Sequence, residues 1–282
     1  MQDYWSRVLD RGLSRRRVLS IALSGMGAAL FAACEGGSAK PTAVPATATL
    51  APPSDVVASG KVRVAIDMRF APPDATTKEP RGIAEIAREL AKRMNVQLEM
   101  KFYAAVPGED VDLRAGTVDV AAMLPFEPER LTGLEFTKPM ETLDTTFLVP
   151  PSSPIRVPSD ADKPGVRIVV QGTSNEALIR ATVKQATISV AASPAMALDL
   201  LRSNQADAFA QYRFQLDPLV SQLPGSKVLN DTWTTSDQMM VVAAGRPELA
   251  AYVRDFAEQV RTSGLLAQWL DRAGIAGLRV VK

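Results

Sequence analysis

The sequence predicts an α/β fold, and three observations support this prediction. Short β-branched segments, such as residues 61–67 and 166–170, alternate along the chain with segments of helical periodicity. Hydrophobic residues make up 46% of the chain and charged residues 22%, as in ordinary globular proteins. The 282 residues are enough for two lobes, each with its own core. Regular alternation of strands and helices favours a largely parallel sheet.

The first half contains three expected strands, at residues 61–67, 96–103 and 118–123. The helix expected at residues 82–94 has an apolar face, formed by Ile83, Ile86, Ala87, Leu90, Ala91 and Met94. A shorter helix is expected to end at Arg114, before Gly116.

The second half repeats this order. We expect strands at 166–170, 187–191 and 206–210, and helices at 176–184, 194–203 and 247–260.

One helix-to-strand connection occurs twice in the sequence. Residues 112–119 (DLRAGTVD) end a helix and open a strand, and residues 199–207 (DLLRSNQAD) do the same with one residue more. This local repeat indicates two related lobes, although such corners recur in many α/β folds.

The residue counts exclude several kinds of site. The chain has no histidine and a single cysteine, Cys34. It therefore lacks Ser-His-Asp and Cys-His catalytic units, histidine metal sites and an internal disulfide. We expect no metal and no cofactor.

Residues 1–33 have the pattern of an export signal. An arginine-rich start precedes an apolar run at residues 18–33, which is shorter than the roughly 20 residues that a membrane-spanning helix needs. The end of this run, Phe31-Ala32-Ala33-Cys34, resembles the lipobox of bacterial lipoproteins, in which the cysteine is acylated. Residues 14–19 (SRRRVL) resemble a twin-arginine signal, so this route and the general secretory route are both open.

Residues 34–59 are rich in Ala, Thr, Pro, Gly and Ser, and we expect a disordered linker there. Removal of residues 1–33 takes away five arginines and two aspartates, leaving 27 of the 32 basic and 29 of the 31 acidic residues. Because no basic excess remains, we expect no nucleic-acid partner.

Several segments, in order, resemble the family 3 extracellular solute-binding proteins, which are amino-acid-binding components of bacterial ABC uptake transporters. The matching segments are 60–64 (GKVRV), 70–72 (FAP), 113–120 (LRAGTVDV), 128–139 (PERLTGLEFTKP) and 169–174 (VVQGTS). The resemblance covers residues 60–273.

The resemblance implies a two-lobed type II periplasmic-binding fold with a ligand cleft between the lobes. Lobe 1 would contain residues 60–147 and 241–282, and lobe 2 residues 148–240. The chain would cross between the lobes near residues 147–150 and return near 239–242.

The resemblance also places a ligand carboxylate between the lobes. Arg130 matches the family position that grips this carboxylate, and a guanidinium can pair with it through two parallel hydrogen bonds. From the other lobe, Thr173 and Ser174 would present the N–H groups of a helix start, which favour an anion. Solvent exposure of Arg130 and simple helix capping by Thr173 or Ser174 are the alternatives.

Three further residues are candidates for ligand contact. Phe70 would form an apolar wall, or would simply pack beneath its Pro loop. Asp67 would reach a ligand cation, or would cap a turn. Gln211 stands where the family commonly has an aspartate for the ligand ammonium, and its amide would accept a hydrogen bond without a charge. The ligand is then either a carboxylate without a primary amine or an amino acid held by another acid, such as Asp231 or Asp237.

We therefore expect a monomeric, non-enzymatic binding protein. It would be anchored outside the cytoplasm by lipidated Cys34 and would deliver a carboxylate-bearing solute, an amino acid or a related compound, to an ABC permease. The alternatives are a solute sensor without transport and a dehydratase-like enzyme, for which Glu127 and Glu129 are the candidate acids or bases.

Overall fold

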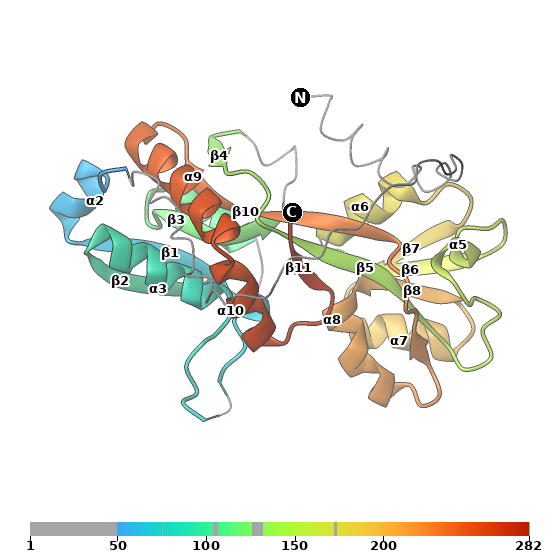
Figure 1. Ribbon diagram of the computed structural model, residues 1–282. Helices are drawn as coiled ribbons and strands as arrows, with labels where there is room; N and C mark the ends of the chain where they lie inside the picture. Colours follow the sequence, from blue (N-terminus) through green and yellow to red (C-terminus); the bar gives the residue numbers. More distant parts are fainter. Residues whose placement is uncertain (1–49, 75, 104–106, 126–131, 172–173, 282) are drawn as a thin grey trace, which may run out of the picture. The chain divides into compact units, whose positions relative to one another are not determined.

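A mixed β-sheet organises the chain. The computed structural model describes residues 50–281, apart from 75, 104–106, 126–131 and 172–173. These residues form an eleven-stranded sheet whose main order is β2-β1-β3-β10-β5-β8-β6-β7 (Figure 1). The strands are β1 (Lys61–Asp67), β2 (Gln97–Tyr103), β3 (Val120–Pro125), β4 (Leu134–Phe136), β5 (Glu141–Val149), β6 (Arg167–Gln171), β7 (Thr187–Ala191), β8 (Ala208–Tyr212), β9 (Lys227–Val228), β10 (Thr234–Ala243) and β11 (Leu278–Val280).

The sheet has a parallel group at each end, as the strand–helix alternation predicts. β1 pairs in parallel with β2 and β3, and β6 pairs in parallel with β7 and β8. We call these groups, with the helices that cover them, lobe 1 and lobe 2. Between them lie the antiparallel strands β5 and β10 (Figure 1). β5 pairs with β10 through residues 141–145 and with β8 through residues 145–148, so its sheet partner changes at Thr145.

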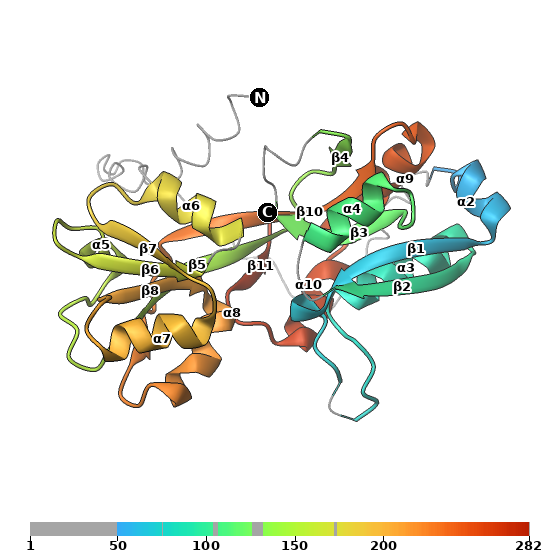
Figure 2. The ribbon, with the colours of Figure 1, turned by 180° about the vertical axis from the view of Figure 1, so that it is seen from behind.

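Helices cover both faces of each parallel group. In lobe 1, α3, α9 and α10 pack on one face and α4 on the other (Figures 1 and 2). In lobe 2, α6 and α7 contribute to separate hydrophobic clusters on the two faces. Their bounds are α3 (Ile83–Met94), α4 (Pro107–Arg114), α6 (Ser174–Thr182), α7 (Pro194–Arg202), α9 (Pro247–Thr262) and α10 (Leu265–Ala273). The remaining helices are α2 (Ser54–Ser59), α5 (Pro158–Ala161), α8 (Arg213–Leu216) and the 3-10 helices η1 (Met68–Phe70) and η3 (Asp217–Gln222). None of the helices in the described part of the chain is long and apolar enough to cross a membrane.

The end of the expected disordered linker is ordered: residues 54–59 form helix α2, which packs on lobe 1. Val56 is buried in the lobe 1 core. Ser54 donates from its N–H and its Oγ to Glu248 at the start of α9, over 3.0 and 2.8 Å. Asp55 pairs with Arg246 at 2.6 Å. Composition alone missed this helix because its partners lie about 190 residues further along the chain.

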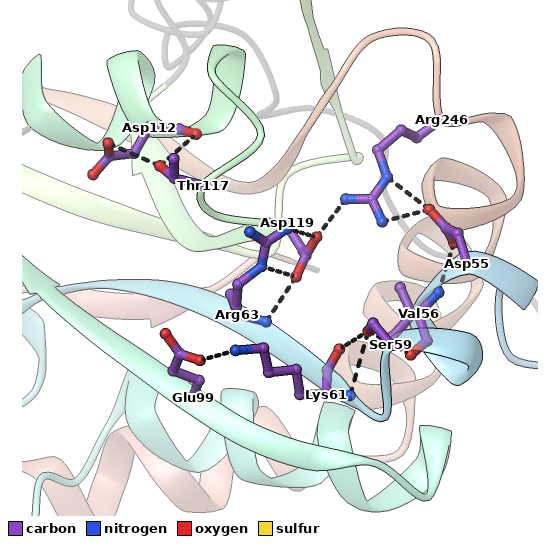
Figure 3. Close-up of polar contacts among 10 residues, drawn as sticks. All are labelled: Asp55, Val56, Ser59, Lys61, Arg63, Glu99, Asp112, Thr117, Asp119 and Arg246. Atoms are coloured by element: carbon purple, nitrogen blue, oxygen red, sulfur yellow. Dashed lines mark hydrogen bonds and ion pairs between the residues drawn. The ribbon is translucent and has the colours of Figure 1, made fainter.

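An ion-pair network connects α2 to the sheet (Figure 3). Asp119, which precedes β3, lies between Arg63 of β1 and Arg246, at 2.8 and 2.6 Å from their guanidinium nitrogens. Burial raises the pKa of Asp119, but hydrogen bonds from both arginines outweigh this effect and hold the pKa below its usual value. Asp119 is therefore ionised at neutral pH.

The repeated corner of the sequence has the same hydrogen bonds in both lobes. Asp119 accepts from the backbone N–H and the guanidinium of Arg63 at 2.8–2.9 Å. Asp207, which precedes β8, accepts from the same groups of Arg167 in β6 at 2.8–3.0 Å. In each lobe the aspartate therefore fixes the start of one parallel strand against the start of its neighbour.

Candidate functional site

The described part of the candidate site lies where strands of lobe 2 end. β6 and β8 are parallel, so their carboxyl ends meet at one edge of the sheet, and α6 and α8 begin there. Gln211 is the penultimate residue of β8, and Asn175 lies in the first turn of α6. The carboxyl ends of strands are the usual place for ligands in open α/β sheets.

A buried hydrogen-bond network fixes Gln211. The Nδ2 amide of Asn175 donates to Gln211 Oε1 over 3.1 Å, and the backbone N–H of Tyr212 donates to the same oxygen over 3.0 Å. Thr145 of β5 in turn donates through Oγ1 to Asn175 Oδ1 over 3.0 Å. Thr145, Asn175 and Gln211 are all buried. Because a backbone N–H can only donate, Oε1 must be the atom that faces Tyr212.

The Nε2 end of the Gln211 amide differs from its Oε1 end. Its Nε2 atom is buried and has no hydrogen-bond acceptor in the described part of the chain. The sequence suggested that Gln211 would accept a hydrogen bond from the ligand. In the structure its oxygen already has two donors, so the group left for a ligand is a donor.

Asp67 is held within the chain by Arg69. The Asp67 carboxylate accepts from the backbone N–H of Arg69 over 2.9 Å and so caps η1. The Arg69 Nε lies 3.0 Å from both carboxylate oxygens, and its Nη2 contacts one of them as well. Burial lowers the pKa of Arg69, but its hydrogen bonds to Asp67 and the attraction of that charge outweigh burial and raise the pKa above its usual value. The pair is therefore ionic.

An aromatic cluster connects the ends of β1 and β8. Phe70, only 2% exposed, has its ring centroid 5.1 Å from that of Phe214 in α8. Phe214 also stacks on Tyr212, at 6.1 Å and 10° between the ring planes. The Arg69 guanidinium lies 5.6 Å from the Phe70 centroid. Through these contacts Asp67 and Phe70 of lobe 1 come close to the β8 end that carries Gln211.

Four residues of the hydrogen-bond network and the aromatic cluster had not been identified as site residues: Arg69, Asn175, Tyr212 and Phe214. The sequence held two signals for them. Arg69 lies two residues after Asp67, which suits a capped turn, and Phe214 lies three residues after Gln211. No local pattern pairs Asn175 with Gln211, because they are 36 residues apart.

The structure describes only one of the other predicted site residues. Arg130, Thr173, Cys34, Glu127 and Glu129 lie outside the described residues. Ser174 opens α6.

The two aspartates considered as alternatives for the ligand ammonium lie near the β5–β10 pair. Asp231 supplies a backbone carbonyl to Thr146, and Asp237 pairs in register with Thr142.

A pocket of about 240 Å³ lies apart from the candidate site, in lobe 1 beside α9. It contains none of the predicted site residues; its lining is Lys138, Pro139, Met140, Arg254, Asp255, Ala257, Glu258 and Arg261. We place the candidate site at the strand ends instead, because the buried polar network converges there. In the described part of the chain, no group of three or more His, Cys, Asp or Glu residues could hold a metal ion.

Comparison with known proteins identifies the class. The model of the bacterial extracellular solute-binding proteins, family 3, matches residues 62–273. The chain belongs to this family, as the sequence motifs indicated. A search of curated protein sequences found no match.

Solved structures show the same two-lobed fold. The ancestral amino acid-binding protein AncCDT-1, a precursor of cyclohexadienyl dehydratase, is 23% identical, with a TM-score of 0.60 over 77% of this chain and 96% of its own. The periplasmic VFT2 domain of BvgS from Bordetella pertussis is 21% identical, with a TM-score of 0.61 over 77% and 94%. A putative binding component of an ABC transporter from Wolinella succinogenes, complexed with lysine, is 21% identical, with a TM-score of 0.61 over 76% and 95%.

Proposed function

We propose that this chain is the extracytoplasmic substrate-binding component of an ABC uptake transporter. Its ligand is a small carboxylate-bearing solute, an amino acid or a related compound. The observation that carries the proposal is the family match across residues 62–273. The similarity to a putative ABC transporter binding component complexed with lysine supports the same role.

We propose that the solute carboxylate is bound between the lobes. Arg130 pairs with it from lobe 1, and the N–H groups near Thr173 and Ser174 at the start of α6 receive it from lobe 2. Phe70 flanks the solute, and Asp67 acts by holding Arg69 in place. Because the solute contacts both lobes only when they are closed, binding drives closure.

Membrane attachment belongs to the same proposal. Residues 1–33 act as the export signal, Cys34 receives the lipid, and the linker connects it to α2. The bound solute is then released to a permease in the same membrane. The protein works as a monomer, and its lobes correspond to residues 60–147 with 241–282 and to residues 148–240.

Replacement of Arg130 tests this function. The purified protein is screened by thermal shift against amino acids and organic acids, and the best ligand is titrated by calorimetry. Arg130→Ala should weaken its binding at least tenfold, because a charge-assisted hydrogen bond contributes about 1.5–3 kcal/mol. Arg180→Ala, which removes a half-exposed arginine from α6, is the matched control and should leave the affinity within twofold. Equal affinities for the wild type and Arg130→Ala contradict the assignment.

Two alternatives share the binding step and differ in the fate of the bound solute. A sensor without transport binds the solute but supports no uptake, and a dehydratase-like enzyme converts it. The similarity to a precursor of cyclohexadienyl dehydratase is the reason to test the dehydratase-like alternative. Uptake of labelled solute by cells with and without the chain separates transport from sensing. Mass spectrometry of the solute after incubation with the protein detects turnover.

A further inference from the structure

The free amide nitrogen of Gln211 bears on which solute the site accepts. We infer that Gln211 donates a hydrogen bond to the solute, so that the solute presents an oxygen acceptor at this end and carries no ammonium group there. The matching solutes are oxo, hydroxy and dicarboxylic acids. This inference rests on the proposed function, because it concerns the same site.

The orientation of the amide is set by the chain itself. An Asn or Gln amide can be turned by 180° with little change in shape, so its neighbours must decide which atom is oxygen. At Gln211 the backbone N–H of Tyr212, 3.0 Å away, requires an acceptor. The Asn175 amide, 3.1 Å from the same atom, donates because its own oxygen accepts from Thr145. Both neighbours agree, and Nε2 is left as the end without a partner among the described residues.

An unpaired donor in this environment is unusual. Buried polar groups in folded proteins nearly always have a hydrogen-bond partner, and an exception calls for a ligand, a water or a functional role. Gln211 is 1% exposed, and none of the described residues accepts from its Nε2. The position, at the carboxyl end of β8 beside the first turn of α6, is where ligands of α/β sheets bind.

An ammonium group does not suit this end of the site. It has donors only, so it would face the Nε2 donor of Gln211 without a hydrogen bond. Asp67, at the end of β1, is already paired with Arg69 through both of its oxygens. A carboxylate, carbonyl or hydroxyl oxygen, by contrast, satisfies Nε2 directly.

Matched pairs of solutes test the inference on the unmodified protein. Each pair has the same carbon skeleton and differs at one carbon: L-glutamate and 2-oxoglutarate, L-alanine and pyruvate, and L-aspartate and L-malate. In every pair that binds, we expect the oxo or hydroxy acid to bind at least tenfold tighter by calorimetric titration. Tighter binding of the amino acid overturns the inference and leaves the proposed function intact. Binding of neither member of any pair overturns both.

Gln211→Glu provides an isosteric control. One carboxylate oxygen can accept from Asn175 and Tyr212 as before, while the other replaces the free donor with an acceptor. At pH 8.5 the ratio of affinities within each pair should shift at least tenfold towards the amino acid. An unchanged ratio, or an equal loss for both members, overturns the inference. Should this variant fail to fold, the comparison of pairs on the wild type still decides.

Discussion

Glu141 shows how a single side chain makes stability depend on pH. It opens β5 opposite Gln238 of β10 and Val280 of β11 and is fully buried. Neither of its carboxylate oxygens has a hydrogen-bond partner among the described residues. Burial raises its pKa to about 8, because the charged form is not solvated there. The folded protein therefore holds a proton near neutral pH that the unfolded chain releases.

The direction of the effect follows from this proton. Between about pH 5 and 8, stability should fall as pH rises, with a slope approaching ~1.4 kcal/mol per pH unit. Glu141→Gln should remove most of this slope and be more stable than the wild type at pH 8. Urea unfolding at four pH values gives the free energy of unfolding of the wild type and of Glu141→Gln. Glu258→Gln, at a half-exposed position of α9, is the control and should keep the wild-type slope. Parallel curves for Glu141→Gln and the wild type contradict the assignment.

At this scale the sequence left the roles of two predicted site residues open, and the structure shows the partners of their side chains. Gln211 was identified because it stands where the family commonly has an aspartate, but the orientation of its amide depends on Asn175, 36 residues away. Asp67 was expected either to reach a ligand cation or to cap a turn, and it caps η1 while pairing with Arg69. Side-chain partners brought together by the fold decide such roles, and they leave no local pattern in the sequence.

Helix α2 shows that a short segment can be ordered by distant contacts. Six residues are too few for a stable isolated helix. The buried side chain of Val56, the bonds from Ser54 to Glu248 and the pairing of Asp55 with Arg246 supply what the local sequence lacks. Distant contacts therefore attach α2 to lobe 1 beside the start of α9.

Removal of Arg246 tests this attachment. Arg246→Ala breaks the pairing with Asp55 and the ion pair with Asp119, whose side chain is only 4% exposed. We expect a loss of about 1–3 kcal/mol in the free energy of unfolding, together with faster hydrogen exchange at the amides of Val57 and Gly60. Arg254→Ala, which removes an exposed ion pair between α9 and Glu135, should cost less than about 1 kcal/mol. Equal effects of the two variants would show that the network does not hold α2.

The elements that were well predicted share one property. Strands β1, β6 and β7 and helices α3, α7 and α9 have strong local periodicity, and the structure places them within a few residues of the expected ranges. α2 lacks this periodicity and was expected to be disordered. Its order comes from tertiary contacts alone.

At the scale of the whole molecule, the two lobes repeat one construction. The Arg63–Asp119 and Arg167–Asp207 pairs join neighbouring parallel strands with the same set of hydrogen bonds. The sequence repeat at residues 112–119 and 199–207 predicted this relation. It could not predict how β5 and β10 join the parallel groups in one sheet, because antiparallel pairing between residues 141–145 and 234–238 depends on the complete fold. The lobe boundaries proposed from the family resemblance stay a prediction.

The central claim is that one small carboxylate is bound between Arg130 and the start of α6. A crystal structure of the protein with its best-binding solute tests this claim most directly. We predict a carboxylate in contact with the Arg130 guanidinium and with N–H groups at residues 173–175, and a solute oxygen within hydrogen-bonding distance of Gln211 Nε2. A solute bound elsewhere, such as the pocket beside α9, or an Arg130 side chain directed into solvent away from the solute, would contradict the account.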